Sequence, residues 1–206
     1  MEEAIEAAMQ GANVLVWAME MSRFEWLARA YSSISARQGY VNAEIGGINY
    51  DVGFENRALL TGQLTEEFEA GFRVFLAQME EGELMPGNIT VRAADDTDFI
   101  KRDVRQLEAD ILQTKADVVL VDPIYLMDYE ANTSKTSGGD VANTSKKIRR
   151  IAGYTNTVIH VVTQAEEVKD DKDDDGNREL RAPRRGEYKK TSSILEDSTY
   201  AFGIDS

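Results

Sequence analysis

Short apolar runs alternate with amphipathic stretches along most of this chain. Apolar runs of about four to eight residues between polar or turn residues are typical of strands buried on both faces of a sheet. The sequence predicts such strands at 13–17, 88–93, 118–121, 157–164 and 199–204. Because the stretches between them carry apolar residues at helical spacing, strands and helices alternate. This alternation indicates an α/β domain with a mostly parallel central sheet flanked by helices.

Capping residues and apolar periodicity indicate where the helices lie. Ser22 and Glu25 form the pattern of a capping box, so a helix should begin at Ser22. Its expected apolar face consists of Phe24, Leu27, Ala28 and Tyr31. Further helices are expected at 2–10, 66–80, 97–113 and 142–152. The expected apolar stripe of the 97–113 helix consists of Ile100, Val104, Leu107 and Ile111. Residues 35–56 are interrupted by glycines and give no clear assignment.

Composition restricts the class of protein. The chain has 206 residues, of which 42% are hydrophobic and 29% are charged, so we expect one soluble domain over 1–206. The absence of cysteine excludes a disulfide scaffold and a cysteine-ligated zinc site, and it fits a reducing cytoplasm. No apolar run approaches membrane-spanning length. These features predict a cytoplasmic protein without membrane contact.

Taken alone, the net charge of −14 argues against a protein that binds nucleic acid, because the phosphate backbone favours basic surfaces. Basic residues nevertheless gather locally within 146–150 and 181–190. Local fields act at clefts and pores, so an acidic protein can still hold DNA at such places. The charge therefore leaves DNA binding open.

Polar side chains follow three of the predicted strands near the point where each strand ends: Glu20, Asp122 and Gln164. The carboxyl ends of parallel strands line one crevice of an open sheet. An acid that positions water, an acid near a metal ion and an amide that senses charge would suit nucleotide hydrolysis. An acid at a strand end can also simply cap the following helix, so the residues alone leave both interpretations open.

Five stretches, in the same order along the chain, resemble the DnaB-type replicative helicases. They are VLVWAMEMSRFEWLAR (14–29), TGQLTEEF (61–68), ITVRAADDTDFIKRDVRQLEADILQTKADVVLVDPIYLM (89–127), VIHVVTQAEE (158–167) and PRRGEYKKTSSILEDSTYAF (183–202). Each stretch alone is a weak signal, but together they cover nearly the whole chain. The resemblance implies a RecA-like domain that takes part in ATP-driven translocation on DNA and unwinding by a hexameric ring.

The resemblance also implies a role for each strand-end residue. Glu20 matches the catalytic glutamate, which polarises the attacking water, and Asp122 matches the Walker B aspartate, which acts on Mg²⁺. Gln164 matches the glutamine that couples the nucleotide to the DNA-facing loops, and Arg29 is expected to contact the nucleotide. The implied cofactors are ATP and Mg²⁺.

Two segments, 131–141 and 168–182, fall where this family has its DNA-facing loops. Both lack the apolar residues that would hold them on the sheet, so we expect them to be mobile without a ligand. The residues expected to contact single-stranded DNA are Lys135, Ser137, Gly138, Gly139, Arg184 and Arg185. The other implied partners are further copies of the chain in a hexamer, a primase and a helicase loader.

The family's P-loop motif, G-x-x-x-x-G-K-[ST], does not occur in these 206 residues. The resemblance puts the P-loop before Met1 and the arginine finger after Ser206. Because P-loop amides and a lysine hold the triphosphate, we expect these residues by themselves to bind ATP·Mg²⁺ weakly and not to hydrolyse it. Two alternatives stay open: another RecA-type ATPase, such as a recombinase or ring ATPase, and a non-hydrolysing DNA-binding or assembly module that lost its P-loop.

Overall fold

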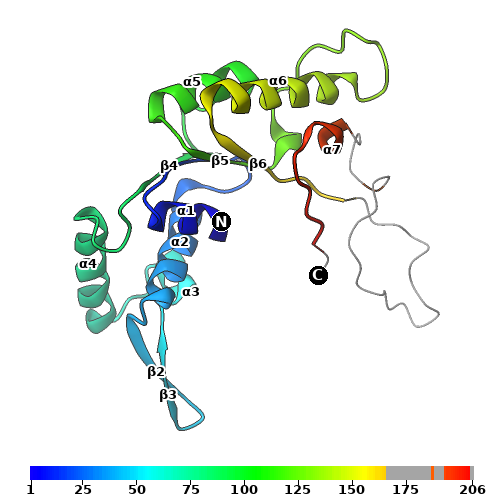
Figure 1. The fold of residues 1–206 in the computed structure, drawn as a ribbon. Coiled ribbons are helices and arrows are strands. Elements are labelled where there is room, and N and C mark those ends of the chain that lie inside the picture. The colour runs from blue at the N-terminus through cyan, green and yellow to red at the C-terminus, as the bar shows by residue number, and fades with distance from the viewer. Residues whose placement is uncertain (166–186, 188–192, 205–206) are drawn as a thin grey trace, which may run out of the picture.

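The computed structural model describes residues 1–165, 187 and 193–204 of the chain (Figure 1). Its centre is a four-stranded sheet in the order β4-β1-β5-β6, and every pairing in it is parallel. The strands are Asn13–Ala18 (β1), Asn88–Ala93 (β4), Val118–Asp122 (β5) and Val158–Val161 (β6). The predicted α/β architecture with a mostly parallel central sheet is therefore confirmed.

Helices cover both faces of this sheet. They are Glu2–Met9 (α1), Arg23–Arg37 (α2), Asn56–Thr61 (α3), Glu66–Glu80 (α4), Val104–Thr114 (α5), Gly139–Thr155 (α6) and Ser193–Asp197 (α7), with a 3-10 helix at Ile124–Leu126 (η1). Figure 1 shows α5 and α6 on one face and α1 and α2 on the other, with α3 and α4 beyond α2. Within the described part of the chain, no helix is long and apolar enough to cross a bilayer.

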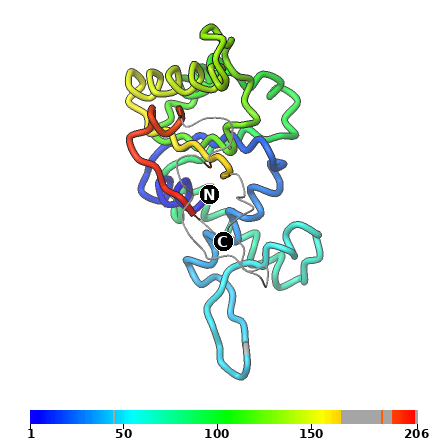
Figure 2. Tube along the Cα trace, turned by 90° about the vertical axis from the view of Figure 1, so that its right-hand side faces the viewer, coloured from blue at the N-terminus to red at the C-terminus, as the bar shows by residue number. Residues whose placement is uncertain are grey.

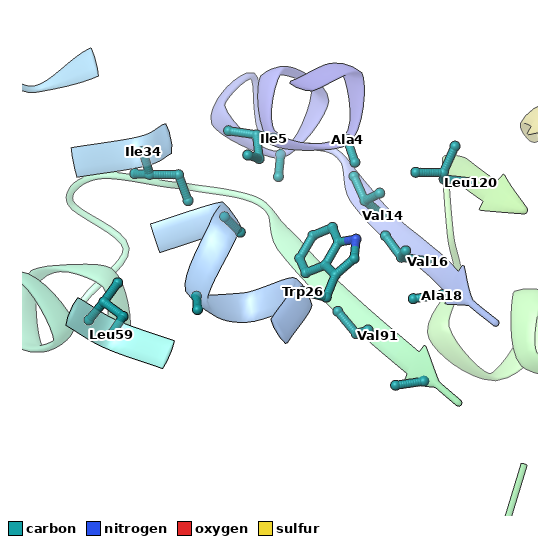
Figure 3. Packing of buried hydrophobic residues seen from close by; sticks show 14 of the residues in the cluster. Ala4, Ile5, Val14, Val16, Ala18, Trp26, Ile34, Leu59, Val91 and Leu120 are labelled. Carbon is teal, nitrogen blue, oxygen red and sulfur yellow. The ribbon is translucent and has the colours of Figure 1, made fainter. Parts of the chain in front are cut away.

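Strand β1 separates two hydrophobic clusters because its side chains alternate between the faces of the sheet. Val14 and Val16 belong to the cluster formed with α1 and α2. Leu15 and Trp17 belong to the cluster under α5 and α6. Figure 3 shows Trp26 of α2 packed over β1 and β4 within the first cluster. Burial on both faces explains why β1 is a continuous apolar run.

The capping box predicted at the start of α2 is confirmed. The Ser22 hydroxyl accepts a hydrogen bond from the Glu25 amide, and the Glu25 carboxylate accepts one from the Ser22 amide. The buried face of α2 differs from the prediction, however. Of the expected face only Ala28 is fully buried, and Phe24 is 58% exposed. Trp26 and Ile34, which were not part of the expected face, are buried instead. Helices α1 and α3 also contact α2, so tertiary packing selects its buried face.

The helix predicted over 97–113 begins only at Val104. Asp103 is its N-cap, and its carboxylate accepts hydrogen bonds from two amides of the first turn at 3.0 and 2.9 Å. Ile100 therefore lies outside the helix and is 82% exposed, so its place in the predicted stripe was wrong. Phe99, in the loop before α5, is buried in the core instead of Ile100.

Two of the predicted strands also differ from the structure. The run over 157–164 forms a strand only at Val158–Val161. The run over 199–204 lies within the described residues and is not a strand there, and its Tyr200 and Phe202 are exposed. An apolar run becomes a strand only where a neighbouring strand offers backbone partners, which a sequence pattern does not reveal.

The unassigned segment 35–56 contains an antiparallel hairpin of Val41–Ile45 (β2) and Ile48–Val52 (β3). Gly46 and Gly47 form its tip with φ values of 63° and 82°, a conformation that favours glycine at both positions of a tight hairpin turn. Figures 1 and 2 show the hairpin projecting away from the central sheet.

Candidate active site

The turn that carries Glu20 is anchored to both neighbours of β1. The last residue of β1 pairs with Asp122 at the end of β5, and the Met19 amide donates to the Asp122 carbonyl at 2.8 Å. On the other side, the Ala94 amide just after β4 donates to the Met21 carbonyl at 3.0 Å. Glu20 lies between these two anchors and is exposed at the carboxyl edge of the sheet. The strand order therefore brings Glu20 and Asp122 together.

Asp122 is half-buried at this edge. Burial raises the pKa of its carboxyl above the usual value. The amino group of Met1 acts in the opposite direction, and the negative charge of Glu20 raises the pKa further. A carboxylate in such surroundings gains from a nearby cation, and perturbed acids of this kind are common at functional sites.

Asp122→Asn is expected to raise thermal stability at pH 7. The pKa of Asp122 is higher in the folded state than in the unfolded state. Asp122 therefore stabilises the fold at pH values below its unfolded-state pKa, and this stabilisation is lost as the pH rises through its folded-state pKa. Removing the charge should therefore raise the melting temperature at pH 7, by no more than a few degrees because solvent screens the half-exposed carboxyl. At about pH 3 the variant and the wild type should have the same melting temperature.

Differential scanning calorimetry at the two pH values measures this effect. Asp51→Asn, which changes an exposed acid on the hairpin, is the control and should leave the melting temperature unchanged. An Asp122→Asn protein that melts at or below the wild-type temperature at pH 7 would contradict the prediction.

Tyr125, which no sequence pattern marks, contacts Glu20. It lies in η1, directly after β5, and the Ile124 amide of the same turn donates to the Val162 carbonyl at 2.9 Å. The Tyr125 hydroxyl donates a hydrogen bond to Glu20 Oε1, and this bond raises the pKa of Tyr125 to about 12. The contact depends on β1 and β5 being neighbours, so it has no local sequence signal.

Gln164 follows the third strand of this edge, three residues after the end of β6. The Val162 amide donates to the Val121 carbonyl at 2.9 Å, so the pairing with β5 continues one residue past β6. Gln164 lies beyond this bond and is exposed. The three strand-end residues thus follow adjacent strands β1, β5 and β6, while their catalytic roles stay predictions.

Arg29 lies on the exposed side of α2. The Ser22 amide and hydroxyl hold the pKa of the Glu25 carboxyl below its usual value, and the charge of Arg29 adds to this effect. Among the described residues, Arg29 forms no ion pair with Glu20 or Asp122. Its contact with a nucleotide stays a prediction.

The first predicted DNA-facing loop is held in shape by its own polar groups. Asn132 Nδ2 donates to the Thr136 carbonyl at 2.7 Å, and Asn143 Nδ2 of α6 donates to the Ala131 carbonyl at 2.8 Å. Lys135 is exposed in this loop and has a φ of 57°. The arrangement presents the Lys135 ammonium to solvent.

The end of this predicted loop is helical, which corrects its boundary. Gly138 caps α6 with a φ of 72°, and α6 begins at Gly139. A Cβ on Gly139 would overlap Asn132 Oδ1, so glycine is needed for the close packing of the loop. Ser137 is exposed beside them. The 168–182 segment and the predicted DNA contacts Arg184 and Arg185 lie outside the described residues.

The oxygen groups at the edge fit Mg²⁺ that arrives with a nucleotide. Mg²⁺ keeps several waters and is usually bound by one or two carboxylates together with substrate phosphates. Asp122, with Glu20 beside it, supplies such a carboxylate. In the described ranges no group of three or more acidic or histidine side chains could hold a metal on its own. The triphosphate itself would need a P-loop, which is not among these 206 residues.

Comparison with known proteins defines the fold. No family model and no curated protein matches the sequence. A solved structure, described as that of a DnaB-like replicative helicase and its interactions with primase, matches with a TM-score of 0.63. The match covers 95% of this chain and 42% of the helicase chain, at 14% sequence identity.

This chain has the fold of the part of the DnaB-like replicative helicase that it matches. The RecA-like architecture implied by the five stretches of resemblance is thereby confirmed. The chain spans less than half the length of the DnaB-like protein that it matches.

Proposed function

We propose that this chain is the motor domain of a DnaB-type hexameric helicase, which uses ATP hydrolysis to move along single-stranded DNA and unwind the duplex. The observation that carries the proposal is the anchoring of Glu20 beside Asp122 at the carboxyl edge of the sheet. Ligands bind at this edge in open parallel sheets. The shared fold and the five collinear stretches support the same function.

In this proposal each residue at the edge has one task. Glu20 accepts the proton of the attacking water, and Asp122 holds Mg²⁺ through its water shell. The ion, when bound, neutralises charge that develops on the phosphates. Gln164 couples the bound nucleotide to the conformation of the DNA-facing loops, and Arg29 contacts the nucleotide. The phosphates also need the grip of a P-loop, which these residues do not contain.

In the proposed ring, the DNA contacts would face the centre. Lys135, the Ser137 hydroxyl and the Gly138 amide would contact phosphates, joined by Arg184 and Arg185. The proposed partners are five further copies of the chain, a primase and a helicase loader. The absence of cysteine supports a cytoplasmic site of action.

The test is ATP hydrolysis, with and without single-stranded DNA, by the protein in which these residues are joined to a P-loop. We expect hydrolysis that requires Mg²⁺ and rises when single-stranded DNA is added, together with unwinding of a forked duplex. DNA binding without hydrolysis would instead favour the non-hydrolysing module.

Lys135→Ala is expected to weaken binding of single-stranded DNA by a similar factor for all base sequences. The ammonium would contact a phosphate, and phosphate contacts carry no sequence information. The slope of log affinity against log salt should become shallower by about 0.7, the value for one contact with a single strand. Fluorescence anisotropy with labelled oligonucleotides at several salt concentrations measures both effects.

Lys115→Ala is a matched control for this experiment. Lys115 also carries a positive φ, 51°, against 57° for Lys135, so both substitutions remove one charge from the same backbone conformation. Lys115 precedes β5 and so lies at the opposite edge of the sheet. Equal losses in the two variants, or an unchanged salt slope in Lys135→Ala, would contradict a phosphate contact by Lys135.

A further inference from the structure

Tyr125 reaches Glu20 from a different strand end. Its turn, η1, follows β5, and its backbone is fixed by the bond from the Ile124 amide to the Val162 carbonyl. The Ile124 side chain is buried, which holds the turn on the sheet. Glu20 follows β1, on the turn that is bonded to Asp122 and Ala94. The hydroxyl of Tyr125 therefore joins two independently anchored turns.

The bond uses one oxygen of the carboxylate. Glu20 Oε1 accepts from Tyr125, and Oε2 makes no hydrogen bond with any other described residue. An exposed glutamate side chain otherwise samples several rotamers, and ordering it has an entropic cost. With Oε1 held, Oε2 stays available to an attacking water, because Glu20 is exposed.

We propose that Tyr125 is a positioning residue that holds Glu20 by Oε1, so that Oε2 faces the attacking water. The inference rests on the proposed ATPase function and adds a residue to it. Catalytic groups act only from near-attack geometry, and small displacements are costly. The tyrosine is a neutral donor, so it orients Glu20 beside Asp122 without an added charge.

Tyr125 keeps its proton throughout the physiological range. The hydrogen bond to Glu20 is the largest cause, and burial and the charges of Glu20 and Asp122 act in the same direction, raising the pKa of Tyr125 to about 12. The hydroxyl is thus a donor at every pH at which the protein would work.

Tyr125→Phe, made in a version of the protein extended to include a P-loop, removes the hydroxyl and keeps the ring. We expect kcat for ATP hydrolysis to fall about tenfold, with nucleotide affinity unchanged, because only the orientation of the base is lost. In a Glu20→Gln background the same substitution should cause no further loss, since the residue that it orients is already inactive.

Tyr154→Phe is the matched control. Tyr154 also has a glutamate as its main influence: the Glu108 carboxylate raises the pKa of Tyr154 to about 12. That pair joins α5 and α6, away from the β1–β5 edge. The control removes another tyrosine hydroxyl that a glutamate influences and should leave kcat at the wild-type value.

A second measurement detects the hydrogen bond between Tyr125 and Glu20 without ATP hydrolysis. The ¹³C resonance of the tyrosine Cζ atom responds to hydrogen bonding, and Tyr125→Phe identifies the signal of Tyr125. Glu20→Gln should shift this signal, and Glu44→Gln on the hairpin should not. A wild type without ATPase activity would overturn the proposed function. An active wild type with unchanged kcat in Tyr125→Phe, or an unshifted Cζ signal in Glu20→Gln, would overturn the role of Tyr125 alone.

Discussion

Glu20→Gln is expected to lower ATP hydrolysis by roughly two to four orders of magnitude, the usual effect of losing a general base or water-positioning group. Glutamine has nearly the same shape as glutamate but does not accept a proton at neutral pH. Glu20 is exposed and lies between the two backbone anchors of its turn, so the substitution should leave the fold unchanged. Nucleotide affinity should therefore stay at the wild-type level.

Single-turnover hydrolysis and equilibrium nucleotide binding, measured in a version of the protein extended to include a P-loop, separate these two effects. Glu44→Gln, an exposed acid on the hairpin, is the control and should hydrolyse ATP at the wild-type rate. Turnover of Glu20→Gln within a few-fold of the wild type would mean that Glu20 is only an acid flanking α2.

Trp26→Ala is expected to destabilise the fold by about 3–5 kcal/mol, the range for removing a large buried aromatic side chain. Trp26 is 1% exposed and belongs to the cluster that joins α1 and α2 to β1 and β4 (Figure 3). Its removal leaves a cavity between the helices and the sheet that the anchored backbone cannot close. The expected loss is a large share of the roughly 5–15 kcal/mol by which native domains are stable.

Urea unfolding followed by circular dichroism measures this change. Phe24→Ala is the control, because Phe24 lies two residues away on the same helix but is 58% exposed. It should cost no more than about 0.5 kcal/mol. Trp26→Phe should fall between the two, which keeps the prediction testable if the alanine variant does not fold. Equal effects at Trp26 and Phe24 would contradict the packing of α2 against the sheet.

Local patterns predicted the helices whose boundaries depend on nearby residues. The start of α2 was predictable because the Ser22–Glu25 box satisfies amides within one turn. The start of α5 was missed because the apolar spacing extends back to Ile100, although Asp103 caps the helix four residues before Leu107. Periodicity does not say which apolar residue is inside the helix when a capping residue interrupts the pattern.

Packing decided which side chains are buried. The spacing on α2 made Phe24 part of the predicted core, whereas the structure buries Trp26 and leaves Phe24 exposed. A helix that contacts a sheet and two other helices buries a face set by all three neighbours. The run at 199–204 likewise has strand composition without a strand partner among the described residues.

By itself, the sequence determined the alternation of strands and helices and the polar residues that end the strands. Glu20, Asp122 and Gln164 were therefore predictable as neighbours of one edge, because the carboxyl ends of parallel strands share an edge whatever their order. Only the tertiary structure decided that β1 lies between β4 and β5. That order bonds the turn of Glu20 to Asp122 and brings Tyr125 to its carboxylate. Strand order depends on contacts between segments far apart in the chain, which local patterns of apolar and polar residues do not encode.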